Sequence, residues 1–288
     1  MAISRAQLVK ELEPGLNALF GLEYKRYENQ HAEIYTTESS DRAFEEEVML
    51  SGFANANVKV EGSGVAYDEA QETYTARYTH DTLALAFSIT EEAIEDNLYD
   101  RLASRYTKAL ARSMSNAKQV KAVTPLIDGL PSTDGYDSGD GVSLFNTSHT
   151  TVSGTAVKNT LTTQADLNET SLEQALIDIA AFTDERGLRV AARGVKMIIP
   201  SANQFNAERL MKSQGRTGTA DNDINAVASM GMIPQGYRVN NFLTDSDSWY
   251  IITDVPNGMK MFQRAALKTA MEGDFDTGNV RYKARERY

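Results

Sequence analysis

The chain has 288 residues, an apolar content of 41% and a net charge of −11, the composition of a folded globular protein. Cysteine is absent, which excludes disulfides and thiolate chemistry and fits folding in the cytoplasm. The acidic balance argues against a protein that coats nucleic acid but leaves open a container for it, and no stretch approaches the roughly 20 apolar residues of a membrane helix.

The N-terminal segment, residues 4–20, is predicted to be helical. Its leucines recur at helical intervals, and Pro14-Gly15 is expected to break or kink the helix. Two interpretations stay open: an arm that bends over a neighbouring subunit, or a surface helix that covers its own core.

Residues 32–87 lack helical periodicity. Val58–Val60 and Glu72–Phe87 alternate like strands, and both sides of the second stretch are largely polar. A two-stranded ribbon with two polar faces is marginal alone in water. We therefore expect a neighbouring subunit to cover it, with candidate interface residues Glu45, Glu46, Glu47, Tyr74, Arg77 and Tyr78.

A long helical pattern then runs from Ser88 to Val123 without Gly or Pro. Ser88 and Glu91 have capping-box spacing, and Pro125 is expected to end the helix. Apolar residues form a narrow stripe at Ile94, Leu98, Leu102, Tyr106, Leu110, Met114 and Ala117. A helix of this length spans roughly 50 Å, which favours a structural protein over an enzyme.

The remainder mixes helices and strands. Residues 124–167 read as a long loop, and a helix is predicted from Asn168 towards Gly187. Further predicted elements are strands at Val195–Ile199, 237–240, 249–253 and 260–264 and short helices at 202–212 and 221–230, the latter capped by Asp221-Asn222-Asp223. Without a regular βαβ alternation, this pattern predicts the α+β class.

The C-terminal strand carries a row of cations. At strand period, one side holds Arg281, Lys283, Arg285 and Arg287. Either this face is solvated or an acidic surface opposes it, from the first turns of the long helix or from the Glu45–Glu47 run.

Catalytic and metal-binding signatures are weak. The three histidines, His31, His80 and His149, have no zinc-ligand spacing, and no phosphate-binding loop is present. Ser148-His149 beside Asp137 and Asp140 allows a hydrolase hypothesis. The carboxylates of Asp128, Asp134, Asp137 and Asp140 allow a calcium hypothesis without the EF-hand spacing. We expect no catalytic residue, cofactor or metal.

Several longer stretches carry a family resemblance. They are Leu12–Leu22, Ser40–Glu46, Tyr78–His80, Arg105–Leu110, Gly141–Phe145 with Ser148-His149, Ala165–Thr170, Gly218–Asn225 and Met271–Gly278. On these residues, which are spread over nearly the whole length, the chain resembles the major capsid proteins of tailed bacteriophages, specifically the Mu-like major head subunit family.

The resemblance implies the HK-ninety-seven-type (Johnson) capsid fold. The implied parts are an N-terminal arm (1–35), an extended E-loop with adjoining peripheral strands (36–87), a peripheral domain with the spine helix (88–129), an axial domain (130–257) and a return to the peripheral domain (258–288). It implies a virion subunit that is assembled in the host cytoplasm into hexamers and pentamers enclosing DNA without sequence-specific binding.

The resemblance also implies partners. We expect a separate scaffolding protein, because no scaffold-like N-terminal extension is present, as well as a portal and decoration proteins. The family's aromatic, glycine-rich tail is missing after Tyr288, which leaves the partner of the final strand open. The alternatives are an encapsulin-like cargo shell and a soluble hydrolase that uses His149.

Overall fold

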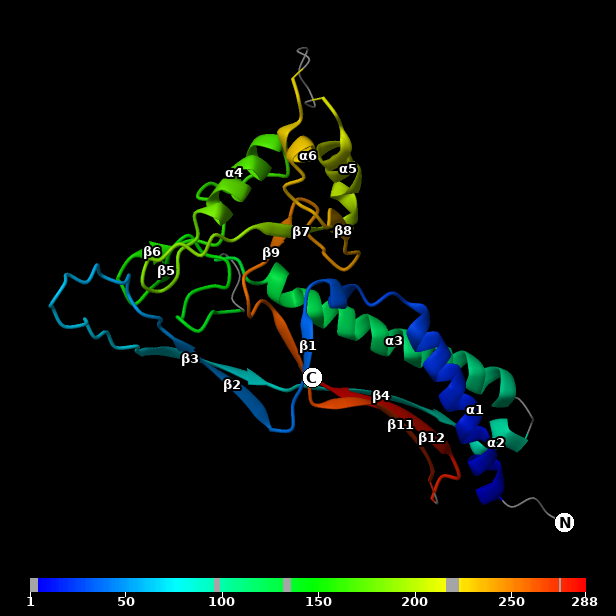
Figure 1. The fold of residues 1–288 in the computed structure, drawn as a ribbon. Coiled ribbons are helices and arrows are strands. Elements are labelled where there is room, and N and C mark those ends of the chain that lie inside the picture. The colour runs from blue at the N-terminus through cyan, green and yellow to red at the C-terminus, as the bar shows by residue number, and fades with distance from the viewer. Residues whose placement is uncertain (1–4, 96–98, 132–135, 216–222, 275) are drawn as a thin grey trace. The chain divides into compact units, whose positions relative to one another are not determined.

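The computed structural model describes residues 5–95, 99–131, 136–215, 223–274 and 276–288, which form two compact units (Figure 1). Unit 1 comprises Met1–Glu45, Thr79–Ala122 and Lys260–Tyr288, and unit 2 comprises Glu46–Tyr78 and Val123–Met259. Helices and strands are mixed in both, which confirms the predicted α+β class. The five-part domain layout stays a prediction.

Unit 1 is built on a three-stranded sheet. Its central strand β12 (Val280–Arg287) is antiparallel to both β4 (Thr82–Ile89) and β11 (Ala265–Gly273), which identifies the partners of the final strand. One face of the sheet packs against α1 (Arg5–Arg26) and α3 (Tyr99–Ile127) (Figure 1).

The core of unit 1 is aromatic at its centre. The Tyr282 ring lies 6.4 Å from that of Phe20 on α1 and 5.6 Å from that of Phe87 on β4. Beside this sheet, β1 (Thr36–Ser39) pairs in parallel with β10 (Lys260–Gln263), and η1 (Gln30–Glu33) is a short 3-10 helix. Burial of large rings fixes the register of the sheet against the helices.

The helix α1 runs through Pro14, so the predicted break near residue 14 is wrong, whereas the alternative, a kink, stays a prediction. A proline inside a helix costs about 3 kcal/mol. Leu16 and Phe20 offset this cost because both are buried in the core beyond the proline. The helix therefore continues to Arg26.

The long helix starts later and ends later than predicted. Ser88 lies in β4 opposite Arg281, so it is not the helix cap; the Thr90 hydroxyl instead accepts the backbone N–H of Ala93 at 3.4 Å. A short helix, α2 (Glu91–Glu95), precedes α3, and residues 96–98 lie outside the described residues. Pro125 lies within the last turn of α3, where it removes only one terminal hydrogen bond.

The apolar stripe of α3 is confirmed in part. Leu110 and Met114 are buried, together with Ala103 and Ala111. Tyr106 is 47% exposed, contrary to the prediction, and its ring contacts Phe87 at 5.7 Å. The side chains of Ile94 and Leu98 lie outside the described residues.

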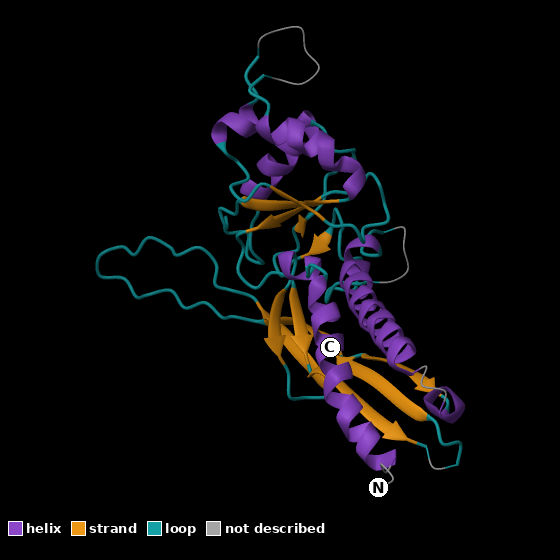
Figure 2. Cartoon of the chain, turned by 90° about the vertical axis from the view of Figure 1, so that its right-hand side faces the viewer, coloured by secondary structure: helices purple, strands orange, loops and turns teal. Residues whose placement is uncertain are grey.

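The predicted 72–87 stretch divides into two strands. β3 (Glu72–Thr79) pairs with β2 (Phe44–Leu50), whereas β4 joins the sheet of unit 1. The division occurs at Asp81, whose backbone exchanges two hydrogen bonds with Tyr288. The predicted strand Val58–Val60 is wrong: the segment between β2 and β3 forms a long loop (Figure 2).

Unit 2 contains a second three-stranded sheet. Its central strand β7 (Gly194–Ile199) is parallel to β8 (Tyr237–Val239) and antiparallel to β9 (Tyr250–Thr253). All three strands lie near their predicted positions. The remaining elements of the unit are β5 (His149–Thr150), β6 (Ala156–Val157), α4 (Glu169–Ala180), η2 (Ser201–Asn203), α5 (Gln204–Lys212) and α6 (Ala226–Met230).

Local capping sets the helix bounds in unit 2. The Asn168 side chain caps α4 in a capping box with Ser171. The helix ends before the predicted Gly187, which has φ +83° and lies in the turn that follows. Asn225, not Asp223, caps α6; Asp221 and Asn222 lie outside the described residues.

Candidate functional site

The strands β2 and β3 form a ribbon that carries most of the predicted interface residues. Arg77 holds Glu46 across the ribbon, with Nε–Oε1 at 2.7 Å and Nη2–Oε1 at 2.5 Å. Glu45 instead accepts a 2.6 Å hydrogen bond from the Ser40 hydroxyl, and Tyr78 is exposed. Glu45 and Glu46 of the acidic run are thus engaged within their own chain.

Tyr74 fixes the ribbon to a neighbouring loop of unit 2. A Cβ added to Gly139 would lie 2.3 Å from Cδ2 of Tyr74, so the ring rests directly on the glycine backbone. Burial, with the nearby charges of Glu185 and Asp140, raises the pKa of the Tyr74 phenol. Only glycine at position 139 permits this approach.

A second loop of unit 2 holds the neck of the long loop 51–71. The Arg186 guanidinium donates to Gly52 O at 3.1 Å and to Glu69 O at 2.6 Å, so one side chain joins both sides of the neck. Ser51 and Gln71 close the neck with two further hydrogen bonds. No motif pointed to Arg186, because this contact depends on how distant segments meet.

Beyond the neck, loop 51–71 exposes large apolar side chains. Val58 is 95% exposed and Tyr67 is 97% exposed, and the same loop also exposes Phe53, Val60 and Val65. A soluble monomer rarely displays so many apolar residues together on one excursion. This loop has the composition of a surface that is buried in an assembly.

The outer face of the sheet in unit 1 is basic. On β12, Arg281, Lys283 and Arg285 are exposed and alternate with buried residues, as predicted from the strand period. Arg281 is paired with Asp274, and Lys268 lies opposite Arg285 on β11. Small residues flank most of the row on the adjacent strands, at Ala84, Ala86, Ser88 and Ala270, and the exposed Glu272 lies opposite Arg281.

Of the inward residues of β12, Glu286 is charged and only 1% exposed. Its carboxylate lies 3.4 Å from Lys118 Nζ on α3 and accepts hydrogen bonds from the Tyr24 hydroxyl at 3.3 and 3.4 Å. Lys118 also lies over the Tyr288 ring, 5.3 Å from its centroid. This cluster joins α1, α3 and β12, and no pattern in the sequence predicted it.

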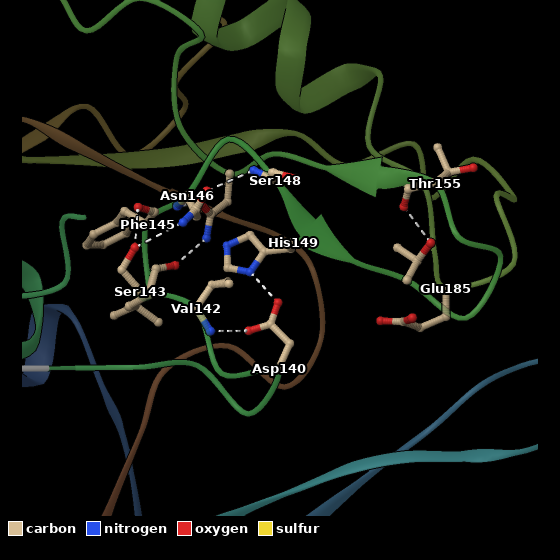
Figure 3. A network of polar contacts seen from close by, with 12 residues as sticks. Asp140, Val142, Ser143, Phe145, Asn146, Ser148, His149, Thr155 and Glu185 are labelled. Atoms are coloured by element: carbon tan, nitrogen blue, oxygen red, sulfur yellow. Dashed lines mark hydrogen bonds and ion pairs between the residues drawn. The ribbon is translucent and has the colours of Figure 1, made fainter.

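The hydrolase hypothesis depends on His149, which belongs to a polar network in unit 2 (Figure 3). His149 Nδ1 lies 2.8 Å from Asp140 Oδ2, and hydrogen bonds from His149 and the Val142 backbone lower the pKa of Asp140 despite its burial. In the described part of the chain, His149 Nε2 is buried without a hydrogen-bond partner, so it receives no hydrogen bond from the Ser148 hydroxyl of the hypothesis. The His149–Asp140 pair therefore lacks the nucleophile contact of a triad.

The other titratable groups have structural roles. Ser40 contacts His80 Nε2 at 2.9 Å, and His31 Nδ1 contacts Gln119 at 2.9 Å. Among the described residues, no three His, Asp or Glu side chains are arranged to hold a metal ion. Asp134 of the calcium hypothesis lies outside those residues. No helix in the described ranges is long and apolar enough to span a membrane.

Comparisons with known proteins address the family and the fold. The family described as "Phage capsid protein" matches residues 72–288. No curated protein matches the sequence.

Solved structures of capsids share the fold at low identity. The bacteriophage JBD30 capsid decorated with minor capsid protein trimers is 12% identical, covers 76% of this chain and 92% of its own, and has a TM-score of 0.55. The JBD30 procapsid is 15% identical with coverages of 84% and 100% and a TM-score of 0.53, and a virus-like particle from Pyrococcus furiosus is 10% identical with coverages of 94% and 91% and a TM-score of 0.51. The predicted HK-ninety-seven-type fold is confirmed.

Proposed function

The chain belongs to the phage capsid protein family, a structural and not an enzymatic family, and we propose that it forms the shell of a tailed-phage head. In this proposal, subunits assemble into hexamers and pentamers that enclose double-stranded DNA. The narrower assignment to the Mu-like major head subunits rests on the sequence stretches quoted above. The observation that carries the proposal is the apolar loop 51–71, held at its neck yet exposed in the single subunit.

Opposite charges on two surfaces of the subunit support a position for the ribbon and its loop in the assembled shell. Residues 44–79 contain seven acidic and two basic residues, whereas the outer face of β12 displays a row of cations. We infer that the ribbon of one subunit lies over this outer face on a neighbour, where small flanking residues allow close approach. Glu45, Glu46, Glu47, Tyr74, Arg77 and Tyr78 would then meet Arg281, Lys283, Arg285 and Arg287 across the contact.

Assembly in the host cytoplasm with a scaffolding protein, followed by incorporation in the virion with a portal and decoration proteins, completes the proposal. These partners follow from the resemblance to tailed-phage head subunits. None of them requires a catalytic site in this chain.

The test separates folding from assembly. Val58→Ser with Tyr67→Ser leaves the free energy of unfolding unchanged, because both side chains are exposed in the subunit. The double variant should form few or no shells when the full-length protein is mixed with scaffold and viewed by negative-stain microscopy. Ile177→Ser, at an exposed residue of α4, is the matched control and should assemble normally.

A substitution of Arg186 provides a second test of the proposed function. Arg186→Met should reduce shell yield because both carbonyls at the loop neck lose their shared donor. Arg189→Met, in the same turn and exposed, is its control. Strictly monomeric wild-type protein in the presence of scaffold, or normal shells from the Val58–Tyr67 double variant, would count against the proposal.

A further inference from the structure

The helix α3 has an unusual charge distribution for an acidic chain. From Arg101 to Ile127 it holds six basic residues and no acidic one, whereas the whole chain has a net charge of −11. Three of the six have acidic partners on other elements: Lys118 pairs with Glu286, Lys121 with Asp81 and Arg112 with Glu23. Three of the six, Arg105, Lys108 and Arg112, form a separate group.

That group forms a row along one side of the helix. Arg105, Lys108 and Arg112 are spaced at i, i+3 and i+7, on the side opposite the buried Leu110 and Met114, and span about 10 Å. The Arg112 side chain is 64% exposed and lies 3.6 Å from Glu23 on α1. Arg105 and Lys108 are exposed, and neither has an ion-pair partner among the described residues.

The residues around the row help to decide whether its partner is another protein or the phosphates of a nucleic acid. The exposed residues between and beyond these cations include Ala109, Ser113 and Asn116. Two aromatic rings also lie near the row: Tyr106, whose ring contacts Phe87, and Tyr27, whose ring lies under the Arg112 guanidinium. Protein interfaces depend on aromatic or large aliphatic anchors, which loop 51–71 supplies, whereas both rings near the row already have partners within their own chain. Contact with phosphates needs only accessible cations, and Glu23 lies beside Arg112, whereas Arg105 and Lys108 have no ion-pair partner among the described residues.

We propose that the α3 row, Arg105, Lys108 and Arg112, contacts the phosphate backbone of double-stranded DNA inside the shell. This inference rests on the proposed function, because the partner is the DNA that the shell encloses. The contact carries no sequence information, since every base pair presents the same phosphates. In a chain with a net charge of −11, the row supplies local attraction where the acidic surface as a whole repels DNA.

The test measures how DNA affinity depends on salt. Full-length Arg105→Gln/Lys108→Gln protein is compared with wild type by fluorescence anisotropy on a labelled 30-base-pair duplex over a range of KCl concentrations. Each cation that neutralises a phosphate contributes about 0.9 to the slope of log K against log salt. Loss of two should lower the slope by about 1.8, which at 0.1 M salt is about a 60-fold loss of affinity.

The matched control is Arg209→Gln/Lys212→Gln, which makes the same change in net charge on α5, where Lys212 is already paired with Glu208. It should bind the duplex like wild type. Equal losses in both double variants, loss in the control alone, or no duplex binding by the wild type would overturn the proposal.

Assembly is measured on the same proteins. Arg105→Gln/Lys108→Gln should still form shells, because neither side chain contributes to the buried core. If it forms none while duplex binding is unchanged, the row contacts protein instead and the proposal is wrong. If the wild type forms no shells, the proposed function fails, whereas the duplex measurement still decides whether the row binds DNA.

Discussion

Replacing Lys118 with methionine should strongly destabilise unit 1. The substitution keeps the length of the side chain but leaves the Glu286 carboxylate, 1% exposed, without a cation. At 3.4 Å and an effective dielectric constant of 20, the lost attraction is about 5 kcal/mol. The carboxylate keeps its hydrogen bonds from Tyr24, so we expect a net loss of about 3 kcal/mol, the lower part of the range for a broken buried pair.

The assay is thermal and urea unfolding of the full-length subunit, with hydrogen exchange of β12 amides as the local measurement. Lys121→Met, on the same helix, is the matched control: its partner Asp81 is 62% exposed, so it should cost less than about 1 kcal/mol. Lys118→Met combined with Glu286→Met removes both charges and should recover most of the loss. The reasoning is refuted if Lys118→Met costs no more than Lys121→Met, or if the combined variant is as unstable as the single one.

Three further predictions concern α3 and the polar network of unit 2. Ala109→Pro, at an exposed position, should stop shell formation seen by microscopy, because it removes a mid-helix hydrogen bond at a cost of about 3 kcal/mol; Ala109→Ser should assemble normally. Gly139→Ala should cost about 1–3 kcal/mol and increase hydrogen exchange in β3, since the new methyl group meets the Tyr74 ring; unchanged exchange would contradict this packing. The lowered pKa of Asp140 means that its stabilising effect is full above the unfolded-state pKa and is lost as pH falls through the folded-state pKa. In Asp140→Asn, the free energy of unfolding should therefore fall less steeply between pH 6 and pH 2 than in the wild type. If the two proteins lose stability equally over this range, the Asp140–His149 pair does not contribute to the pH dependence.

Local signals in the sequence predicted the positions of β7 and α4 in unit 2 better than the bounds of the strands and helix between residues 72 and 99. The strand β7 follows from an apolar run ended by Pro200, and the start of α4 follows from Asn168, because both depend on neighbouring residues. The division of residues 72–87 was missed because it depends on Tyr288, which lies far along the chain and fixes Asp81. The start at Ser88 failed for the same reason: pairing with β12 overrides a local capping pattern.

In the candidate site, too, features set by neighbouring residues could be predicted from the sequence, whereas contacts between distant segments could not. The strand period correctly placed Arg281, Lys283 and Arg285 on one exposed face. Arg186 could not be found, because its two acceptors are backbone carbonyls more than a hundred residues away, and a carbonyl leaves no signature in the sequence. The Glu45–Glu47 run was predicted as one possible partner of the cations on the C-terminal strand. Glu46 instead pairs with Arg77, because the pairing of β2 and β3 places the two side chains together.

The position of β12 at the centre of its sheet affects the order of events during synthesis. β4 is made early, but it can pair with β12 only after the ribosome has added residues 280–287. Residues 46–78 and 123–259, which form unit 2, are complete before that point, so unit 2 can fold first. A nascent chain therefore lacks the basic outer face until translation nears its end.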